Sequence, residues 1–190
     1  MTPPEGFRYR DDALTEAEEQ AFVREIESLP FKPFEFHGYL GKRRIVSFGW
    51  RYDYGARAVR RSDPLPPFLL PLRRRAADLT GIDARQLEHA LVTEYAPGAP
   101  IGWHRDKPEF GEVVAFSFVS PCRLRLRRRK GSGWERWAID VQPRSLYRLS
   151  GPVRHDWEHS IPPVAALRYS VTFRTFLGAR RAASSIHTGA

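Results

Sequence analysis

The run RYSVTFRTF, residues 168–176, is the last of six short segments with the residue types of β-strands. The other five are ALVTEY (90–95), VVAFSFVS (113–120), RLRLRRR (123–129), WERWAIDV (134–141) and SLYRLS (145–150). Proline and glycine pairs such as Pro97-Gly98 and Gly151-Pro152 separate them, as expected of turns. Many short strands at regular spacing predict a sandwich or jelly roll.

Two amphipathic helices precede these strands. Thr15 and Glu18 fit a capping box, in which two side chains satisfy backbone N–H groups at a helix start. A second helix is expected after the proline-rich run at 64–67, ending near Gly81. We therefore predict one α+β domain in which the two helices cover one sheet.

The composition excludes several classes of protein. The 190 residues are 42% hydrophobic and 13% aromatic, which excludes a mostly disordered chain. No apolar run approaches the roughly 18 residues of a membrane-spanning helix, and the start MTPPEGFRYRDD lacks the apolar core of a signal peptide. The single cysteine, Cys122, excludes an internal disulfide and a cysteine-based zinc site, so we expect a cytoplasmic protein.

The chain is strongly basic. Lys and Arg total 31 against 22 Asp and Glu, which gives a net charge of +9. Such an excess favours nucleic acid or another anionic partner. A general bias of the sequence towards arginine accounts for the charge equally well, so charge alone leaves both interpretations open.

The segment His104-Arg105-Asp106 offers two metal ligands. Residues i and i+2 of an extended segment point to the same side, so His104 and Asp106 can hold one ion. A second histidine from a distant strand would complete the 2-His-1-carboxylate triad of non-haem Fe(II) oxygenases. His155 and His159 are both candidates, and strand alternation does not decide between them.

The final strand places two arginines on one face. Arg168 and Arg174 share that face with Ser170 and Thr172, and they lie roughly 20 Å apart along the strand. Such a pair could hold a small dicarboxylate between them. The alternative is an outward strand face with solvated arginines.

These segments together resemble the AlkB family of Fe(II)/2-oxoglutarate-dependent dioxygenases, which demethylate alkylated nucleic-acid bases. The resemblance is carried by VTEYAPGAPIGWHRD (92–106), VVAFSFVS, DWEHSIPP (156–163) and RYSVTFRTF, in matching order and spacing. The closing R-Y-S-V-T-F-R is similar to the family's R-x-N-x-T-F-R. A weaker similarity extends back to residues 44–49. The resemblance implies a double-stranded β-helix (jelly roll) with a core at about 90–177, in a single domain over 1–177 and a flexible tail at 178–190.

The resemblance also implies roles for individual residues. The iron ligands would be His104, Asp106 and His159, because the family's distal histidine precedes a small residue and an isoleucine, as His159 does. The 2-oxoglutarate site would comprise Tyr95, Thr93, Arg168, Ser170 and Arg174. Thr93 and Ser170 stand where the family has asparagines, and both keep a hydroxyl donor with a shorter reach. An acid that reads the damaged base often lies two residues past the ligand Asp. Here that position is Pro108, and Glu109 follows it.

Residues 31–62 match the family's nucleotide-recognition lid. If the segment is extended, Phe48, Trp50, Tyr52 and Tyr54 share one face and could stack on a base, with Arg44 nearby. Core packing is the alternative for each ring. A second basic segment, Arg127-Arg128-Arg129, runs into a Gly-Ser-Gly turn and predicts a hairpin that contacts phosphates.

The expected function is oxidative demethylation of alkylated bases in DNA or RNA by a monomer with no membrane contact. The expected cofactors are Fe(II) and 2-oxoglutarate, with O2 as cosubstrate. One alternative is a 2-oxoglutarate-dependent hydroxylase of a protein or small molecule, which Pro108 favours. The other is a non-catalytic nucleic-acid-binding jelly roll, which would not need both the His/Asp/His set and the paired arginines.

Overall fold

Two β-sheets and a helical layer make up the fold. The computed structural model describes residues 2–36, 39–53 and 58–177, so the predicted tail at 178–190 lies outside the described residues. The strands are β1 (Phe7–Arg10), β2 (Lys32–Phe36), β3 (Tyr39–Phe48), β4 (Trp50–Asp53), β5 (Ala58–Arg61), β6 (His89–Tyr95), β7 (Ile101–His104), β8 (Phe110–Phe118), β9 (Cys122–Lys130), β10 (Gly133–Val141), β11 (Leu146–Leu149), β12 (Glu158–Ile161) and β13 (Arg168–Phe176). The helices are α1 (Glu16–Glu27), α2 (Leu69–Thr80), the 3-10 turn η1 (Ala84–Gln86) and α3 (Gly151–His155).

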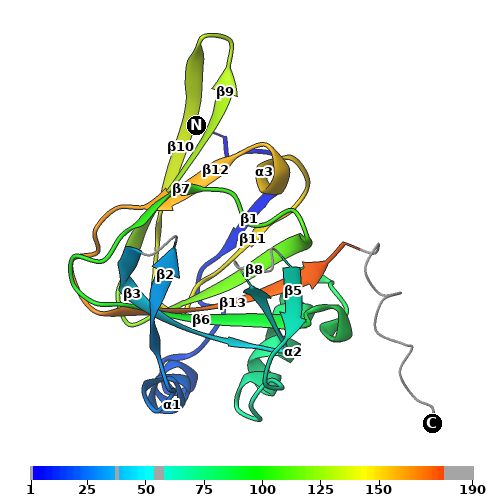
Figure 1. Cartoon of the computed structure of the whole chain (residues 1–190), viewed down its shortest axis with the longest axis vertical. Helices are drawn as coiled ribbons and strands as arrows, with labels where there is room; N and C mark the ends of the chain where they lie inside the picture. Colours follow the sequence, from blue (N-terminus) through cyan, green and yellow to red (C-terminus); the bar gives the residue numbers. More distant parts are fainter. Residues whose placement is uncertain (1, 37–38, 54–57, 178–190) are drawn as a thin grey trace.

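The sheets are built mainly from pairs of strands that are distant in sequence. The larger sheet has the order β1-β11-β8-β13-β6-β3-β2, and the smaller has the order β10-β9-β12-β7 (Figure 1). Strands β4 and β5 form a separate two-stranded ribbon. The pairings between these strands are antiparallel. The predicted α+β jelly roll is confirmed.

Both predicted helices are present with the expected ends. The Glu18 backbone N–H donates to the Thr15 hydroxyl at 3.2 Å, and the Glu18 carboxylate accepts from the Thr15 N–H at 2.8 Å, which completes the capping box. Gly81 closes α2 in the left-handed region, with φ of 74°. None of the described helices is long and apolar enough to span a membrane.

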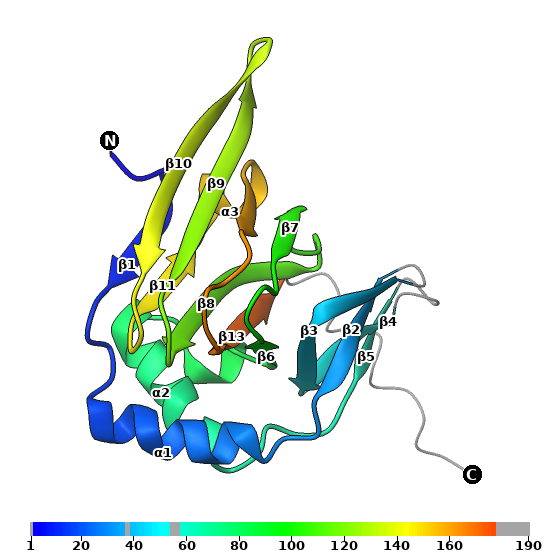
Figure 2. The same cartoon turned by 90° about the vertical axis from the view of Figure 1, so that its left-hand side faces the viewer.

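Two apolar clusters lie on opposite faces of the larger sheet. On one face, α1 and α2 pack against apolar side chains of β6, β8 and β13. Figure 2 shows the two helices below the larger sheet. On the other face, the larger sheet packs against the smaller through residues such as Leu124, Leu126 and Tyr147. In β13 the odd positions Val171 and Phe173 face the helices. The even positions therefore face the space between the two sheets.

The predicted lid continues the larger sheet rather than forming a single extended segment. Strand β3 pairs with β6 through Phe48, opposite Ala90. The chain then turns at Gly49, whose φ of 76° is in the region that favours glycine. A Cβ at this position would lie 2.0 Å from the Glu88 carbonyl oxygen, so the turn also needs the missing side chain. The four predicted aromatic residues therefore do not lie on one continuous strand.

Candidate active site

A cavity of about 530 Å³ opens between the two sheets, at the end where β7 and β12 meet the larger sheet. Its inner wall carries the side chains that the sequence singled out for metal and cosubstrate binding, except that of Arg168, which is not among the residues that line the cavity. These include Thr93, Tyr95, His104, Asp106, His159, Ser170 and Arg174. Its outer wall is formed by residues of β2 and β3 and the segments next to them, among them Lys32, Phe34 and Arg43.

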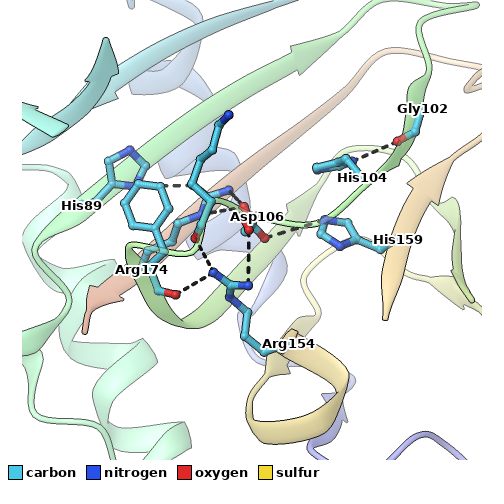
Figure 3. Close-up of polar contacts among 9 residues, drawn as sticks. His89, Gly102, His104, Asp106, Arg154, His159 and Arg174 are labelled. Atoms are coloured by element: carbon cyan, nitrogen blue, oxygen red, sulfur yellow. Dashed lines mark hydrogen bonds and ion pairs between the residues drawn. The ribbon is translucent and has the colours of Figure 1, made fainter. Parts of the chain in front are cut away.

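Strand pairing brings the two histidines together. His104 at the end of β7 lies directly opposite His159 on β12. Their ring centroids are 4.2 Å apart (Figure 3), and both residues line the cavity. The Nδ1 of His104 is 2.9 Å from the Gly102 carbonyl oxygen, so it carries the proton and leaves Nε2 as a lone-pair donor. Burial, followed by the neighbouring His104, lowers the pKa of His159 to about 3, which keeps that imidazole neutral.

Asp106 supplies the carboxylate. Burial by itself would raise its pKa, but the neighbouring Arg174 guanidinium holds it below the usual range, so the side chain is ionised. Arg174 donates to Oδ1 from Nε at 3.0 Å and from Nη2 at 2.7 Å. The other oxygen, Oδ2, is buried, has no hydrogen-bond partner among the described residues and lies 3.8 Å from Nε2 of His159.

The donor set of this cluster fits a ferrous ion. Two neutral imidazoles and one carboxylate are the ligands of the facial triad, and an orphaned buried carboxylate oxygen is what a cation would satisfy. As the side chains stand, with Asp106 turned toward Arg174, no group of three His, Cys, Asp or Glu among the described residues is arranged to hold a metal ion. The assignment of His104, Asp106 and His159 as ligands stays a prediction. His155, the other candidate, is exposed at the end of α3.

The two arginines of β13 differ in their surroundings. Both are buried, with 0% exposure for Arg168 and 8% for Arg174, so the solvated alternative is wrong. Arg174 is compensated by Asp106, whereas all three nitrogens of the Arg168 guanidinium lack a hydrogen-bond partner among the described residues. Arg168 lies over the ring of Tyr95, 4.9 Å from its centroid. A buried cation without an acid is costly, and a carboxylate of 2-oxoglutarate is the kind of group that would compensate it.

Two buried residues near the site had no signal in the sequence. Arg154 of α3 donates to the carbonyl oxygens of Lys107 and Phe110, both at 2.6 Å, and to that of Asp106 at 3.4 Å. It therefore fixes the loop that follows the iron-ligand candidate Asp106. His89 lies against Phe110 and 3.4 Å from Arg174, and burial lowers its pKa. A polar residue in a short helix, or at the start of a strand, looks like a surface residue in a sequence.

Replacing Arg154 with Met is expected to lower the free energy of unfolding by about 3 kcal/mol. The substitution leaves buried carbonyl groups without donors, and each such group costs about 1–3 kcal/mol. Urea unfolding of the metal-free protein measures the change. The matched control is Arg105→Met, because Arg105 lies close by but is exposed, and its hydrogen bond to the His155 carbonyl at 3.3 Å is not buried. Equal losses in the two variants would contradict the assigned role of Arg154.

Three of the six predicted substrate-binding residues are engaged elsewhere. Phe48 is 8% exposed and belongs to the cluster beneath the helices, so the prediction that it stacks on a base is not supported. Arg44 forms a bidentate ion pair with Glu94, with both contacts at 2.7 Å. Trp50 packs edge-on against Phe176, with ring centroids 5.5 Å apart. The side chain of Tyr52 and the whole of Tyr54 lie outside the described residues.

The other predicted contacts need two corrections. Glu109 is not among the residues that line the cavity, although Lys107 of the same loop is. Arg127, Arg128 and Arg129 do not form one phosphate-binding row, because successive residues of a strand face opposite ways. Arg128 pairs with Glu135 at 2.8 Å and lies over Trp157 on the inner face, while Arg127 and Arg129 lie on the outer face.

Known proteins match this fold and this site. The family model of the 2OG-Fe(II) oxygenase superfamily matches residues 8–175. The chain is 28% identical over 175 residues to the Alkylated DNA repair protein ALKBH8 homolog of Arabidopsis thaliana, covering 80% of this chain and 49% of the relative. It is 27% identical over 103 residues to the uncharacterized protein L905 of Acanthamoeba polyphaga mimivirus, covering 47% of this chain and 49% of that protein. The chain thus spans about half the length of these curated relatives.

A solved structure confirms the architecture. The structure of OsALKBH1 superposes with a TM-score of 0.72 at 16% sequence identity, covering 92% of this chain and 99% of that one. At this identity the likeness shows the fold. The family match, in contrast, runs through both sheets and includes every residue discussed for the metal and cosubstrate. The chain therefore belongs to the 2OG-Fe(II) oxygenase superfamily of oxidoreductases and is AlkB-like within it.

Proposed function

We propose that this protein oxidatively demethylates alkylated bases in DNA or RNA. The observation that carries the proposal is that one cavity is lined both by Asp106, with its unpartnered carboxylate oxygen, and by an outer wall that includes Lys32, Phe34 and Arg43. An aromatic ring beside cations is the chemistry that stacks a base and contacts its phosphates. The net charge of +9 and the Arabidopsis relative, named as an alkylated DNA repair protein, support the same substrate class.

In this proposal His104, Asp106 and His159 hold Fe(II), and Arg168 binds a carboxylate of 2-oxoglutarate. Together the iron and 2-oxoglutarate supply the oxidation of an N-methyl group by O2, which releases formaldehyde and leaves succinate and carbon dioxide.

The protein side chains orient these groups and keep their charges fixed. Arg174 keeps Asp106 ionised, and the Gly102 carbonyl fixes the tautomer of His104. Arg154 fixes the loop between Asp106 and Phe110 by holding three of its carbonyl groups. On the outer wall, the Arg43 guanidinium lies 3.8 Å from the centroid of the Phe34 ring. In the proposal this pair contacts the base after it leaves its stack.

A panel of methylated DNA and RNA oligonucleotides, incubated with Fe(II), 2-oxoglutarate and oxygen, tests the proposal. Mass spectrometry is expected to show loss of the methyl group from at least one modified base, together with an equivalent amount of formaldehyde. His159→Ala protein is the control for adventitious oxidation. Demethylation of no base, together with succinate formation that depends on a peptide or small molecule, would instead support the hydroxylase alternative.

A further inference from the structure

The outer face of the smaller sheet carries a row in which arginines and tryptophans alternate. The order is Arg125, Trp103, Arg127, Trp134 and Arg129, and we call this row the arginine–tryptophan ladder. The guanidinium carbons lie 5.1 Å (Arg125) and 4.3 Å (Arg127) from the Trp103 ring centroid, and 4.1 Å (Arg127) and 4.4 Å (Arg129) from that of Trp134. Arg127 is therefore in contact with both indoles.

The ladder follows from the alternation of β9 and its neighbours. Leu124 and Leu126 are fully buried between the sheets, so the arginines at odd positions face outward. Trp103 precedes His104 on β7, and neighbouring residues of a strand face opposite ways. Trp103 of the ladder therefore lies on the face of β7 opposite to that of His104, which lines the cavity. The rest of the ladder lies on β9 and β10. This hairpin projects beyond the rest of the fold (Figures 1 and 2).

The charges of the ladder are only partly compensated. Arg127 donates to Glu158 at 2.6 Å. Arg125 donates from Nε to the neutral hydroxyl of Ser160 at 3.1 Å, and within the described part of the chain neither Arg125 nor Arg129 forms an ion pair with a carboxylate. Contact with an indole face orients a guanidinium but leaves its N–H groups without acceptors. The ladder therefore presents ordered cationic donors to an anion.

We propose that the ladder binds the single strand that flanks the modified nucleotide, an inference that rests on the proposed function. Cations that follow a backbone, combined with aromatic rings on which bases stack, are the features of single-strand binding surfaces. A row of cations along an extended strand suits phosphates repeated along a chain better than one isolated anion. The position of Trp103 connects this row to the rim of the cavity. A long strand with one base in the cavity therefore reaches the hairpin, whereas a short one does not.

The test compares unmodified oligonucleotides of about 4 and about 16 nucleotides, the range of single-strand site sizes, by fluorescence anisotropy over a series of salt concentrations. The wild-type protein is expected to bind the longer strand more tightly. The double variant Arg125→Gln/Arg129→Gln should make the plot of log affinity against log salt less steep. The magnitude of its negative slope should fall by about 1.4, because each single-strand phosphate contact contributes about 0.7. If the variant and the wild type bind equally well at about 1 M salt, the variant should bind roughly 25-fold more weakly than the wild type at about 0.1 M. Arg85→Gln is the control, since Arg85 is 88% exposed and pairs with Asp83 away from the sheet.

A second variant separates an ordered ladder from simple net charge. Trp134→Leu keeps every charge and removes the ring that orders two arginines, so affinity for the longer strand should fall about tenfold with an unchanged salt slope. Thermal melting confirms that each variant is folded. Wild-type affinities that do not depend on strand length would overturn the inference. A double variant that binds the oligonucleotide like Arg85→Gln would also overturn it. So would displacement of the oligonucleotide by polyglutamate at equal charge, because that result would make an acidic protein the partner of the ladder. Demethylation of a methylated trinucleotide by the wild type reports on the proposed function separately.

Discussion

His159→Ala is expected to abolish both iron loading and 2-oxoglutarate turnover, whereas His155→Ala should leave both within about twofold of wild type. His159 lies opposite His104 with ring centroids 4.2 Å apart, and its Nε2 is 3.8 Å from the orphaned oxygen of Asp106. The loss should be at least 100-fold, because removing even a residue that only supports a metal ligand costs about 10–100-fold. His155 is exposed at the end of α3, where substitutions usually change little.

Two measurements keep this result independent of the substrate. Binding of Mn(II) as a redox-inert substitute, followed by calorimetry, reports on the ligands alone. Succinate formation in the absence of any nucleic acid then reports on turnover. His104→Ala should match His159→Ala in both. Asp106→Ala is less informative, because it also leaves the buried Arg174 without its acid. Iron binding lost in His155→Ala and retained in His159→Ala would refute the ligand assignment.

The choice between those two histidines shows what the sequence alone could not supply. Alternation within a strand gives His155 and His159 the same parity relative to His104. The register between β7 and β12 separates them, and this register is a pairing of residues 55 positions apart. Each of these strands has only four residues. Neither contains the long apolar run that made β6, β8 and β13 predictable, so the pairing could not be read from local pattern. The family resemblance was needed to single out His159.

Phe48 and Trp50 do not share the extended face that the sequence suggested, and the reason is local. Phe48 and Trp50 would share a face only if residue 49 were extended. Gly49 instead adopts a positive φ, which ends β3 and reorients the chain into β4. A glycine inside a strand pattern often marks a bulge, or a place where another part of the backbone comes close to the strand. Phe48 consequently packs beneath the helices, and Phe34 of β2 lines the cavity in its place.

The prediction that Arg127, Arg128 and Arg129 contact phosphates together neglects period-two alternation, which already divides them. Arg128 had to lie opposite to Arg127 and Arg129 on any regular strand. What the sequence could not show is the cross-strand register, which places Arg128 opposite Glu135 and Arg129 opposite Trp134. Because of these partners, Arg128 forms an ion pair on the inner face, whereas Arg127 and Arg129 contact tryptophan rings on the outer face. The same principle, applied to β13, correctly placed Arg168 and Arg174, the two arginines of the predicted cosubstrate site, on one face.

Those two arginines are expected to respond differently to substitution. Arg168→Met should weaken 2-oxoglutarate binding roughly 100-fold, since removing one partner of a buried charged pair costs about 2–5 kcal/mol. The same substitution should raise the melting temperature of the cosubstrate-free protein, because it removes a fully buried cation that has no hydrogen-bond partner there. Arg174→Met should lower that melting temperature, because it leaves the buried Asp106 without its partner.

Melting curves with and without 2-oxoglutarate, recorded anaerobically in the presence of Fe(II), measure both effects in one experiment. Arg168→Lys is the matched control, because an ammonium keeps the charge but cannot offer the two parallel donors of a guanidinium. Its cosubstrate-induced shift should lie between those of wild type and Arg168→Met. A destabilised Arg168→Met protein that still gains the full shift from 2-oxoglutarate would mean that Arg168 supports the fold alone. The cosubstrate carboxylate would then have to be bound by Arg174, at the expense of its contact with Asp106.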